Sequence, residues 1–258
     1  MRVVSCGVTD VGMKRADNED RFICSDELNL YAVADGMGGH AAGEVASETA
    51  IATVACRLEA VSGSAGDAEG VPLAPGSSVG TGEILVLFEA SVQEANRTVY
   101  EMSQHNSHLQ GMGTTFTGLW LKDGKAAIAH VGDSRLYLLR GTELRILTTD
   151  HSWVNEQLQR NLITEEEART HRWRNVITRA IGNRLDLLVD MHLVPLQSDD
   201  RLLLCSDGLT NMVSDAEIGT ALYEMDDDVG AACAALVEQA KAAGGDDNIT
   251  VVILKVLE

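Results

Sequence analysis

The chain has 258 residues, of which 45% are hydrophobic and only 4% aromatic, so it can bury a core but offers few rings for stacking on nucleic-acid bases. Its 39 acidic residues outnumber 20 basic ones and give a formal net charge of -19. Such a field repels nucleic acids and anionic membranes and suits cation binding, although solvation of an acidic surface accounts for most of these charges.

Five cysteines are spread along the chain, and no two of them are spaced as Cys-x-x-Cys. The odd number and the wide spacing argue against a disulfide framework and a zinc site and favour a reducing compartment. The first residues lack the apolar core of a secretion signal. No apolar run reaches the roughly 18 residues that a membrane span needs. We therefore expect a cytoplasmic protein.

Short apolar runs bounded by turn residues predict the strands of the fold. The predicted strands cover residues 3–9, 21–25, 30–35, 114–121, 126–131, 136–139, 144–147, 187–194, 202–205 and 249–257. The run 30–35 ends at Asp35, and three glycines follow within four residues. This pattern predicts a tight turn with room for a ligand to approach the backbone. An Asp-Gly pair at 123–124 predicts a hairpin.

Apolar residues spaced three and four apart predict the helices, which cover residues 44–60, 82–102, 152–160, 164–171 and 228–243. The clearest of these is 82–102, whose apolar stripe we assign to core packing. Thr164 and Glu167 form a capping box at the start of one short helix, and Gly244 ends the last helix. The segment 62–82 is rich in Gly, Ser, Ala and Pro and is expected to be an exposed loop.

The strands come in meander-like groups, and the long helices separate or follow these groups. That order is typical of an α+β sandwich and not of a doubly wound parallel sheet. Neither an internal repeat nor a linker is visible in the sequence. We therefore expect residues 1–258 to form a single domain.

Acidic residues recur at strand ends and tight turns, in the loops 15–20, 35–36, 132–135, 205–208 and 244–248. A tight turn explains any one of these loops, because Asp-Gly is a common turn sequence. Their repeated position beside buried apolar runs favours a common carboxylate cluster. Such a cluster would repel itself without cations, and Mg²⁺ and Mn²⁺ prefer oxygen ligands. Two ions that share a carboxylate can activate a water molecule and hold a phosphoryl group.

The order and spacing of these motifs, from Thr9 to Val252, resemble the metal-dependent protein phosphatase family, also called protein phosphatase 2C, in its compact bacterial form. The resemblance implies a four-layer α-β-β-α sandwich, in which two packed antiparallel sheets are flanked by helices. It also implies two Mn²⁺ or Mg²⁺ ions at one end of the sandwich and a weaker third ion.

In this resemblance, Asp35 corresponds to the carboxylate that bridges both ions, and the carbonyl of Gly36 binds one of them. Asp207 and Asp247 correspond to ligands of the other ion. The family pattern of Asp-Asn before Ile-Thr-Val favours Asp247 over Asp246.

Glu19 and Asp20 correspond to an acidic pair, one a direct ligand and the other acting through water. Arg15 corresponds to the arginine that binds the substrate phosphate, and Asp133 to a ligand of the third ion. The implied catalytic set is Arg15, Asp35, Asp207 and Asp247.

Met37 marks a departure from part of the family. Many eukaryotic members carry a histidine at this position, proposed as the general acid for the leaving group. Methionine cannot transfer a proton, which leaves a metal-bound water for that role. His40 lies three residues further on, and we do not assign the role to it, because a packed or capping histidine is the more common case.

The segment of about 148–185 resembles the flap that lies beside the active site in this family. It holds six arginines against five acidic residues. Two uses of these arginines stay open: they contact a phosphorylated partner, or they pair with the acidic body of the protein. Trp153 and Trp173 likewise contact a partner or lie partly buried under the flap.

The resemblance implies hydrolysis of phosphoserine or phosphothreonine in proteins by a hydroxide that bridges two metal ions, opposing a bacterial Ser/Thr kinase. Two alternatives stay open: a non-catalytic module that binds phosphoproteins, and a hydrolase of small phosphate esters. The intact ligand set speaks against the first, and the basic-leaning flap against the second. The expected partner is a phosphorylated protein, such as a kinase or its targets, with neither nucleic acid nor membrane involved. We expect a monomer.

Overall fold

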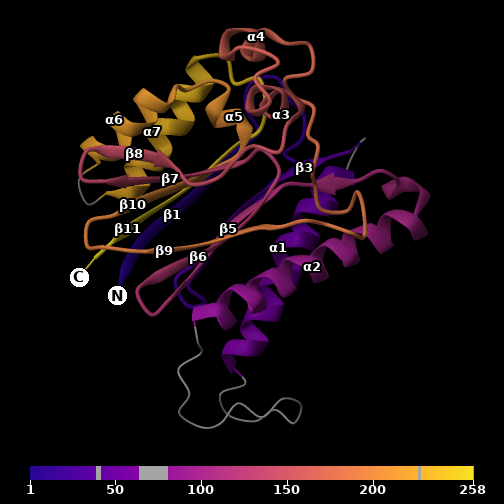
Figure 1. The fold of residues 1–258 in the computed structure, drawn as a ribbon. Helices are drawn as coiled ribbons and strands as arrows, with labels where there is room; N and C mark the ends of the chain where they lie inside the picture. Colours follow the sequence, from indigo (N-terminus) through magenta and orange to yellow (C-terminus); the bar gives the residue numbers. More distant parts are fainter. Residues whose placement is uncertain (39–41, 64–80, 226–227, 258) are drawn as a thin grey trace.

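The structure, a computed structural model, describes residues 1–38, 42–63, 81–225 and 228–257 (Figure 1). The strands are β1 (Val3–Asp10), β2 (Asp20–Ser25), β3 (Leu30–Met37), β4 (Gly113–Thr114), β5 (Phe116–Lys122), β6 (Lys125–Val131), β7 (Arg135–Arg140), β8 (Glu143–Ile146), β9 (Asp190–Pro195), β10 (Arg201–Cys205) and β11 (Ile249–Val256). The helices are α1 (Ala42–Gly63), α2 (Thr81–His105), the 3-10 helix η1 (Ser107–Leu109), α3 (Trp153–Gln159), α4 (Glu165–Thr170), α5 (Asp207–Thr210), α6 (Asp215–Glu224) and α7 (Val229–Ala242).

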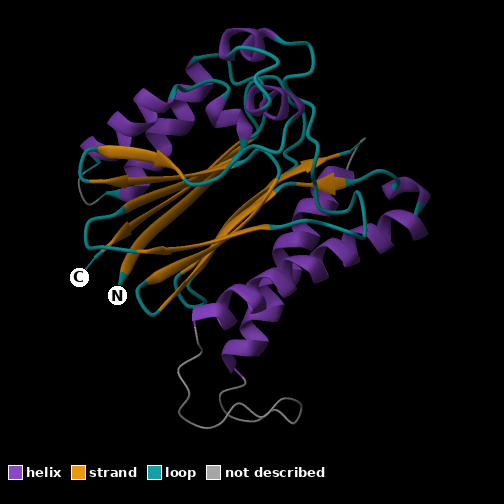
Figure 2. Cartoon of the chain, viewed as in Figure 1, coloured by secondary structure: helices purple, strands orange, loops and turns teal. Residues whose placement is uncertain are grey.

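The strands form two antiparallel sheets that pack face to face (Figure 2). One sheet has the order β1-β11-β10-β7-β8, and the other has the order β2-β3-β5-β6-β9, with β4 also pairing with β3. Helices α6 and α7 contact the first sheet, and α1 and α2 contact the second. The prediction of an α+β, four-layer sandwich of two antiparallel sheets flanked by helices is confirmed.

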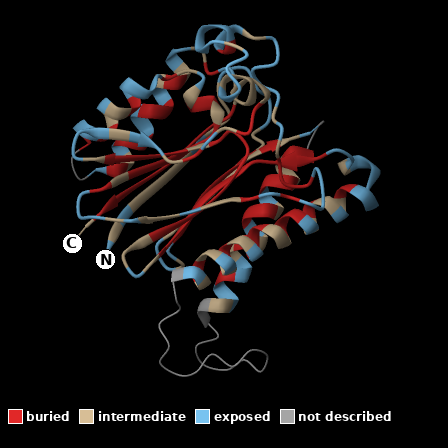
Figure 3. Cartoon of the chain, in the orientation of Figure 1, coloured by how far each residue is buried: buried red, intermediate tan, exposed pale blue. Residues whose placement is uncertain are grey.

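The central strands are buried along most of their length (Figure 3). Their alternate residues face different layers, which explains why these strands are apolar throughout. On β10, Leu202 and Leu204 pack between the two sheets, whereas Leu203 and Cys205 pack beneath α6 and α7. Both faces of the central strands are therefore buried. Among the described residues, no helix combines the length and apolar character needed to cross a membrane.

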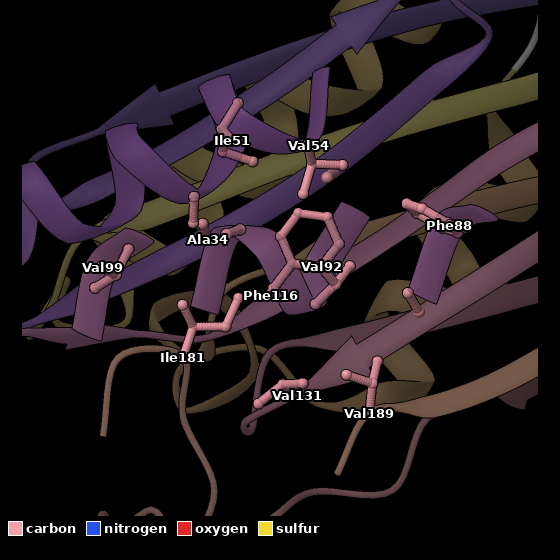
Figure 4. Packing of buried hydrophobic residues seen from close by; sticks show 14 of the residues in the cluster. Ala34, Ile51, Val54, Phe88, Val92, Val99, Phe116, Val131, Ile181 and Val189 are labelled. Carbon is pink, nitrogen blue, oxygen red and sulfur yellow. The ribbon is translucent and has the colours of Figure 1, made fainter. Parts of the chain in front are cut away.

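Helices α1 and α2 form the helical layer on the second sheet. Their apolar stripes pack on residues of β3 and β5 (Figure 4). Phe88 of α2 is buried, and its ring meets that of Phe116 edge-on at a centroid distance of 6.2 Å. Val92 and Val99 continue the same stripe, Val92 four residues after Phe88 and Val99 seven residues after Val92. The assignment of this stripe to the core is thus confirmed.

The chain does not turn at Gly36 as predicted, because β3 continues to Met37. Gly36 pairs with Thr114 of β4, and a Cβ atom there would collide with the carbonyl oxygen of Gly43. Gly36 thus permits close approach of two backbone segments within a strand. The single strand predicted over 114–121 is instead broken at Thr115, whose N–H donates to the carbonyl of Asp35 at 2.9 Å.

The strand predicted over 187–194 begins only at Asp190. The preceding backbone takes its hydrogen bonds from α2 side chains, since Gln93 Nε2 donates to the Leu187 carbonyl at 2.7 Å. Helices α5 and α6 were missed, although Ser214 and Glu217 form the capping box that marks the start of α6. Most of the loop predicted over 62–82 lies outside the described residues, because 64–80 are not described.

Replacing Leu204 by alanine should lower the free energy of unfolding by about 2–5 kcal/mol, because it removes a buried side chain from between the two sheets and leaves a cavity. Urea denaturation measures the change. Leu162→Ala is the matched control, since that side chain is 65% exposed, and it should change stability by about 0.5 kcal/mol or less. Equal losses in both variants would contradict the assigned core.

Candidate active site

The predicted carboxylates are carried by strand ends and connections of both sheets. Asp20 on β2 and Asp35 on β3 are direct partners in the antiparallel register. Asp207 begins α5, right after β10, and Asp247 lies just before β11. Asp133 lies between β6 and β7. Each of Asp20, Asp35, Asp133 and Asp207 is subject to repulsion from other members of this set, so the structure brings the five together.

Asp20 is completely buried. Its Oδ2 atom accepts hydrogen bonds from Ser206 Oγ at 2.7 Å and Thr250 Oγ1 at 2.6 Å, while its Oδ1 atom is buried without a hydrogen-bond partner. Burial, opposed by the two hydroxyl groups and reinforced by Asp207 and Asp247, raises the pKa of Asp20 to about 7. The carboxylate is thus held in place with one oxygen left for a cation.

Asp35 lies at the centre of the set. Burial, and then the charges of Asp20, Asp207, Asp133 and Asp247, raise its pKa well above the ordinary value. Its side chain is within hydrogen-bonding reach of Asp207. Asp35 is therefore the carboxyl group on which the charges of the other four act together.

Asp133 and Asp207 complete the buried part of the cluster. Asp133 is 9% exposed, its Oδ1 atom lacks a hydrogen-bond partner, and burial followed by Asp207 raises its pKa to about 8. Burial and the charge of Asp247 raise the pKa of Asp207 to about 6. Asn211 Nδ2 donates to Asp207 Oδ2 at 3.1 Å, which fixes one oxygen of that side chain.

These observations fit divalent cations. Two buried carboxylate oxygens without partners and four carboxyl groups with raised pKa values show uncompensated negative charge, which a hard cation relieves. In the described part of the chain, however, no three His, Cys, Asp or Glu side chains form one ready cage for an ion. Mg²⁺ agrees with that arrangement, because it is usually held by one or two carboxylates and keeps several waters.

Glu19 is placed by its neighbours in α1 and β3. Its carbonyl accepts hydrogen bonds from Ser47 Oγ at 2.6 Å and from the N–H of Gly36 at 3.2 Å. Its side chain accepts the backbone N–H of Gly43, and a Cβ atom at Gly43 would lie 2.6 Å from Glu19 Oε1. Burial, partly offset by Arg15, raises the pKa of Glu19.

Arg15 pairs with Asp247, since its Nη2 atom lies 2.6 Å from Asp247 Oδ2. Burial opposes its charge, but Asp247, Glu19 and Asp35 together raise the pKa of the guanidinium. The Arg15 side chain is 49% exposed. It therefore stands at the rim of the carboxylate cluster, where a ligand from solvent can reach it.

Asn248 is a site residue that the sequence interpretation missed. Its Oδ1 atom accepts the N–H of Glu19 at 2.8 Å, and its Nδ2 atom donates to the carbonyls of Val11 and Asp17, each at 3.0 Å. It ties the loop of Arg15 to the start of β11. The sequence feature that could have indicated this role is a polar amide residue directly after Asp247 and directly before an apolar strand.

Thr115 was also missed. Its hydroxyl oxygen accepts the N–H of Asp35 at 2.8 Å and lies 2.8 Å from Ser134 Oγ, so it joins the connection after β6 to the end of β3. Together with Ser206 and Thr250 it forms a set of buried hydroxyl groups around the carboxylates. Hydroxyl residues inside apolar runs were the available sequence signal.

Four of the six flap arginines form ion pairs or a ring contact. Arg179 Nη1 lies 2.6 Å from Asp190 Oδ1, and Arg160 and Arg169 pair with glutamates of their own helices at 4.0 and 3.9 Å. Arg172 stacks over the ring of Trp173 at 4.5 Å, and this indole is 40% exposed. His40 lies outside the described residues.

Comparison with known proteins identifies close similarity over the whole chain. Residues 12–243 match the family model described as Protein phosphatase 2C. Protein phosphatase PhpP of Streptococcus pneumoniae is 37% identical over 254 residues, which cover 97% of this chain and 96% of that protein.

Solved structures agree with the sequence matches. The crystal structure of the Mycobacterium tuberculosis serine/threonine phosphatase PstP/Ppp is 35% identical, with a TM-score of 0.85 over 100% of both chains. The catalytic domain of the serine threonine protein phosphatase PstP in complex with two manganese ions is also 35% identical, with a TM-score of 0.83 over 99% of both chains.

Asn248→Ala should lower the free energy of unfolding by about 1–3 kcal/mol, because it leaves an N–H group and two carbonyls without their partner. It should also weaken Mn²⁺ binding, since it releases the loop that carries Glu19. Thermal unfolding and isothermal calorimetry measure the two effects. Asn106→Ala, at an exposed cap of η1, is the control and should leave Mn²⁺ affinity unchanged. Wild-type Mn²⁺ affinity in Asn248→Ala would show that this loop holds its place unaided.

Proposed function

This chain belongs to the protein phosphatase 2C family and is a metal-dependent protein serine/threonine phosphatase, and we propose that its carboxylate cluster binds two divalent cations for the hydrolysis of phosphoserine and phosphothreonine. The observation that carries the proposal is the pair of buried carboxylate oxygens without hydrogen-bond partners, Asp20 Oδ1 and Asp133 Oδ1. Burying a carboxylate oxygen without a partner is costly, and a bound divalent cation would relieve that cost.

The ligands we propose for the two core ions are Glu19, Asp20, Asp35, the carbonyl of Gly36, Asp207 and Asp247. Asp133 is proposed for a weaker third ion. Mn²⁺ and Mg²⁺ both suit this all-oxygen set. When bound, the ions supply an activated water as nucleophile and neutralise the charge of the phosphoryl oxygens.

Arg15 is proposed to bind the phosphate of the substrate. A guanidinium offers two parallel N–H donors that match two phosphate oxygens. In the structure these donors face Asp247, whose charge a bound cation would compensate. Arg15 is then available to hold the phosphate dianion at the exposed rim of the cluster, next to the residues proposed for the ions.

The hydrolysis is proposed to proceed by direct attack of water, without a phosphoenzyme. Cys205, the thiol nearest in sequence to Asp207, is completely buried, and burial raises its pKa to about 12, which disfavours a thiolate nucleophile. Met37 has no proton to give, so we propose that a water molecule donates the proton that the serine or threonine oxygen takes up as its bond to phosphorus breaks.

We further propose that residues 1–258 act as a single domain, a monomer, and that the substrates are phosphoproteins of a bacterial Ser/Thr kinase system. The flap of about 148–185 lies beside Asp133, because the backbone N–H of His151 donates to the carbonyl of Gly132 at 2.7 Å. Its exposed Trp173, with Arg172 stacked on the ring, offers an apolar and cationic surface for a phosphopeptide.

The wild-type protein should release phosphate from a phosphothreonine peptide only in the presence of Mn²⁺ or Mg²⁺. Asp207→Asn, which removes one charged ligand, should lower kcat by roughly a hundredfold or more. Phosphate release measured with Mn²⁺ and with excess EDTA checks both expectations.

Asp199→Asn is the matched control, because Asp199 is exposed and precedes β10, at the opposite end of that strand from Asp207. It has a positive φ of 66°, which asparagine tolerates, so its activity should equal that of the wild type. Turnover in excess EDTA, or normal kcat in Asp207→Asn, would rule out the proposed metal ligands.

Arg15→Ala should lower kcat/KM for the same peptide. The loss of transition-state stabilisation should be about 2–3 kcal/mol, the scale of a charge-assisted bond to a dianion. Most of the change should appear in KM. Mn²⁺ affinity should not fall, because a positive charge has been removed from the neighbourhood of the cations.

Lys14→Ala is the control for this experiment. Lys14 is the neighbouring cation and pairs with Asp246 at 2.6 Å with a side chain that is 63% exposed, so KM should be unchanged. A loss of Mn²⁺ affinity in Arg15→Ala with normal KM would show that Arg15 serves only to order Asp247.

A further inference from the structure

Two buried histidines lie beside the carboxylate cluster and have no place in the proposed chemistry. His130 on β6 is completely buried and His151, at the start of the flap, is 6% exposed. Their rings are 4.7 Å apart. His130 contacts Thr117 of β5, whose Oγ1 atom lies 2.9 Å from its Nδ1 atom, and also the flap, where the Thr149 carbonyl oxygen lies 3.1 Å from its Nε2 atom. His151 joins three separate segments of the chain.

The contacts of His151 define its protonation. The backbone N–H of Gly132 donates to Nδ1 at 3.0 Å, so Nδ1 carries no proton. The Nε2–H group then donates to Asp190 Oδ2 at 3.1 Å. The ring is therefore the neutral Nε2–H tautomer, and burial, its main influence, lowers the pKa of His151 in agreement with that form.

These bonds hold the loop that carries Asp133. Gly132 directly precedes Asp133 and is bound twice by His151, through the ring and through the backbone N–H at 2.7 Å. On the other side, Arg135 donates to both oxygens of Asp150, at 2.9 Å through Nε and 2.7 Å through Nη2. Asp150 and His151, two consecutive flap residues, thus bind both ends of the loop that carries Asp133.

The C-terminal part of the flap also bonds to His151 and to its partner Asp190. The N–H of Thr178 donates to the carbonyl of His151 at 2.8 Å. Arg179 Nη1 donates to Asp190 Oδ1 at 2.6 Å, so Asp190 receives Arg179 on one oxygen and His151 on the other. A change in the path of the flap therefore moves the groups that orient the imidazole.

We propose that His151 is a positioning residue, which accepts the Gly132 N–H and so sets the orientation of Asp133 according to the state of the flap. This role rests on the proposed function, because it needs Asp133 to act in phosphate-ester hydrolysis. His151 touches neither substrate nor ions. It makes the flap a determinant of turnover as well as a surface for substrate.

Two substitutions test the contacts of the two ring nitrogens of His151 separately. His151→Asn keeps an amide oxygen near the position of Nδ1 and so an acceptor for Gly132. His151→Gln reaches toward Asp190 but loses that acceptor. Removing an outer partner of a metal site typically costs about 10–100-fold in activity or affinity. His151→Gln should therefore lower kcat at least about tenfold with less than about a twofold change in KM, while His151→Asn should keep roughly a third of kcat or more.

The readouts are kcat and KM for p-nitrophenyl phosphate with saturating Mn²⁺, and Tm. His192→Gln, at an exposed histidine two residues beyond Asp190 on the same strand, is the control.

If His151→Gln fails to fold, Asp190→Asn, which weakens the hold on the ring, should lower kcat about three- to tenfold at constant KM. Normal kcat in His151→Gln, or equal kcat losses in both His151 variants that follow their losses in Tm, would overturn the proposal. Absence of Mn²⁺-dependent turnover in the wild type would instead refute the proposed function.

Discussion

Repulsion among buried carboxylates is the constraint on which the arrangement of this molecule depends. Asp20, Asp35, Asp133 and Asp207 are all placed where burial and like charges disfavour their ionised forms. A protein can keep such a cluster only if the rest of the fold is rigid enough to hold it. The two packed sheets supply that rigidity, and hydroxyl and amide side chains fix individual oxygens. Cations bound as proposed would resolve this energetic conflict, and folding stability and catalytic readiness would then be linked through the same atoms.

Much of the fold could be predicted, because its signals are local. Short continuous apolar runs, turn pairs such as 123–124, and the regular stripe of α2 each follow from the nearest residues. The candidate site residues could be located for a related reason, since the carboxylates lie at the ends of apolar runs. The resemblance to a family then supplied their roles. The sequence alone could not show that Arg15 pairs with Asp247, which is 232 residues away.

Several of the errors arise from tertiary contacts that override local preference. Gly36 suggested a turn, but its lack of a side chain is needed for backbone contact with Gly43. The strand before Asp190 is shortened because Gln93 takes a backbone carbonyl. Asn248 and Thr115 were overlooked as site residues because their partners are distant in sequence. None of these pairings leaves a periodic trace in the sequence.

The place of β11 in its sheet has a consequence for how the protein is made. The strand that follows Asp247 lies in the interior of the sheet, between β1 and β10, and its residue Thr250 binds the side chain of Asp20 near the opposite end of the chain. Contacts between residues so far apart in the sequence form late in folding, because the long segment between them must first close into a loop. A chain still emerging from the ribosome therefore has neither a complete sandwich nor a complete site. We therefore expect phosphatase activity only after synthesis has passed this strand, and a translation product that ends before it should be inactive.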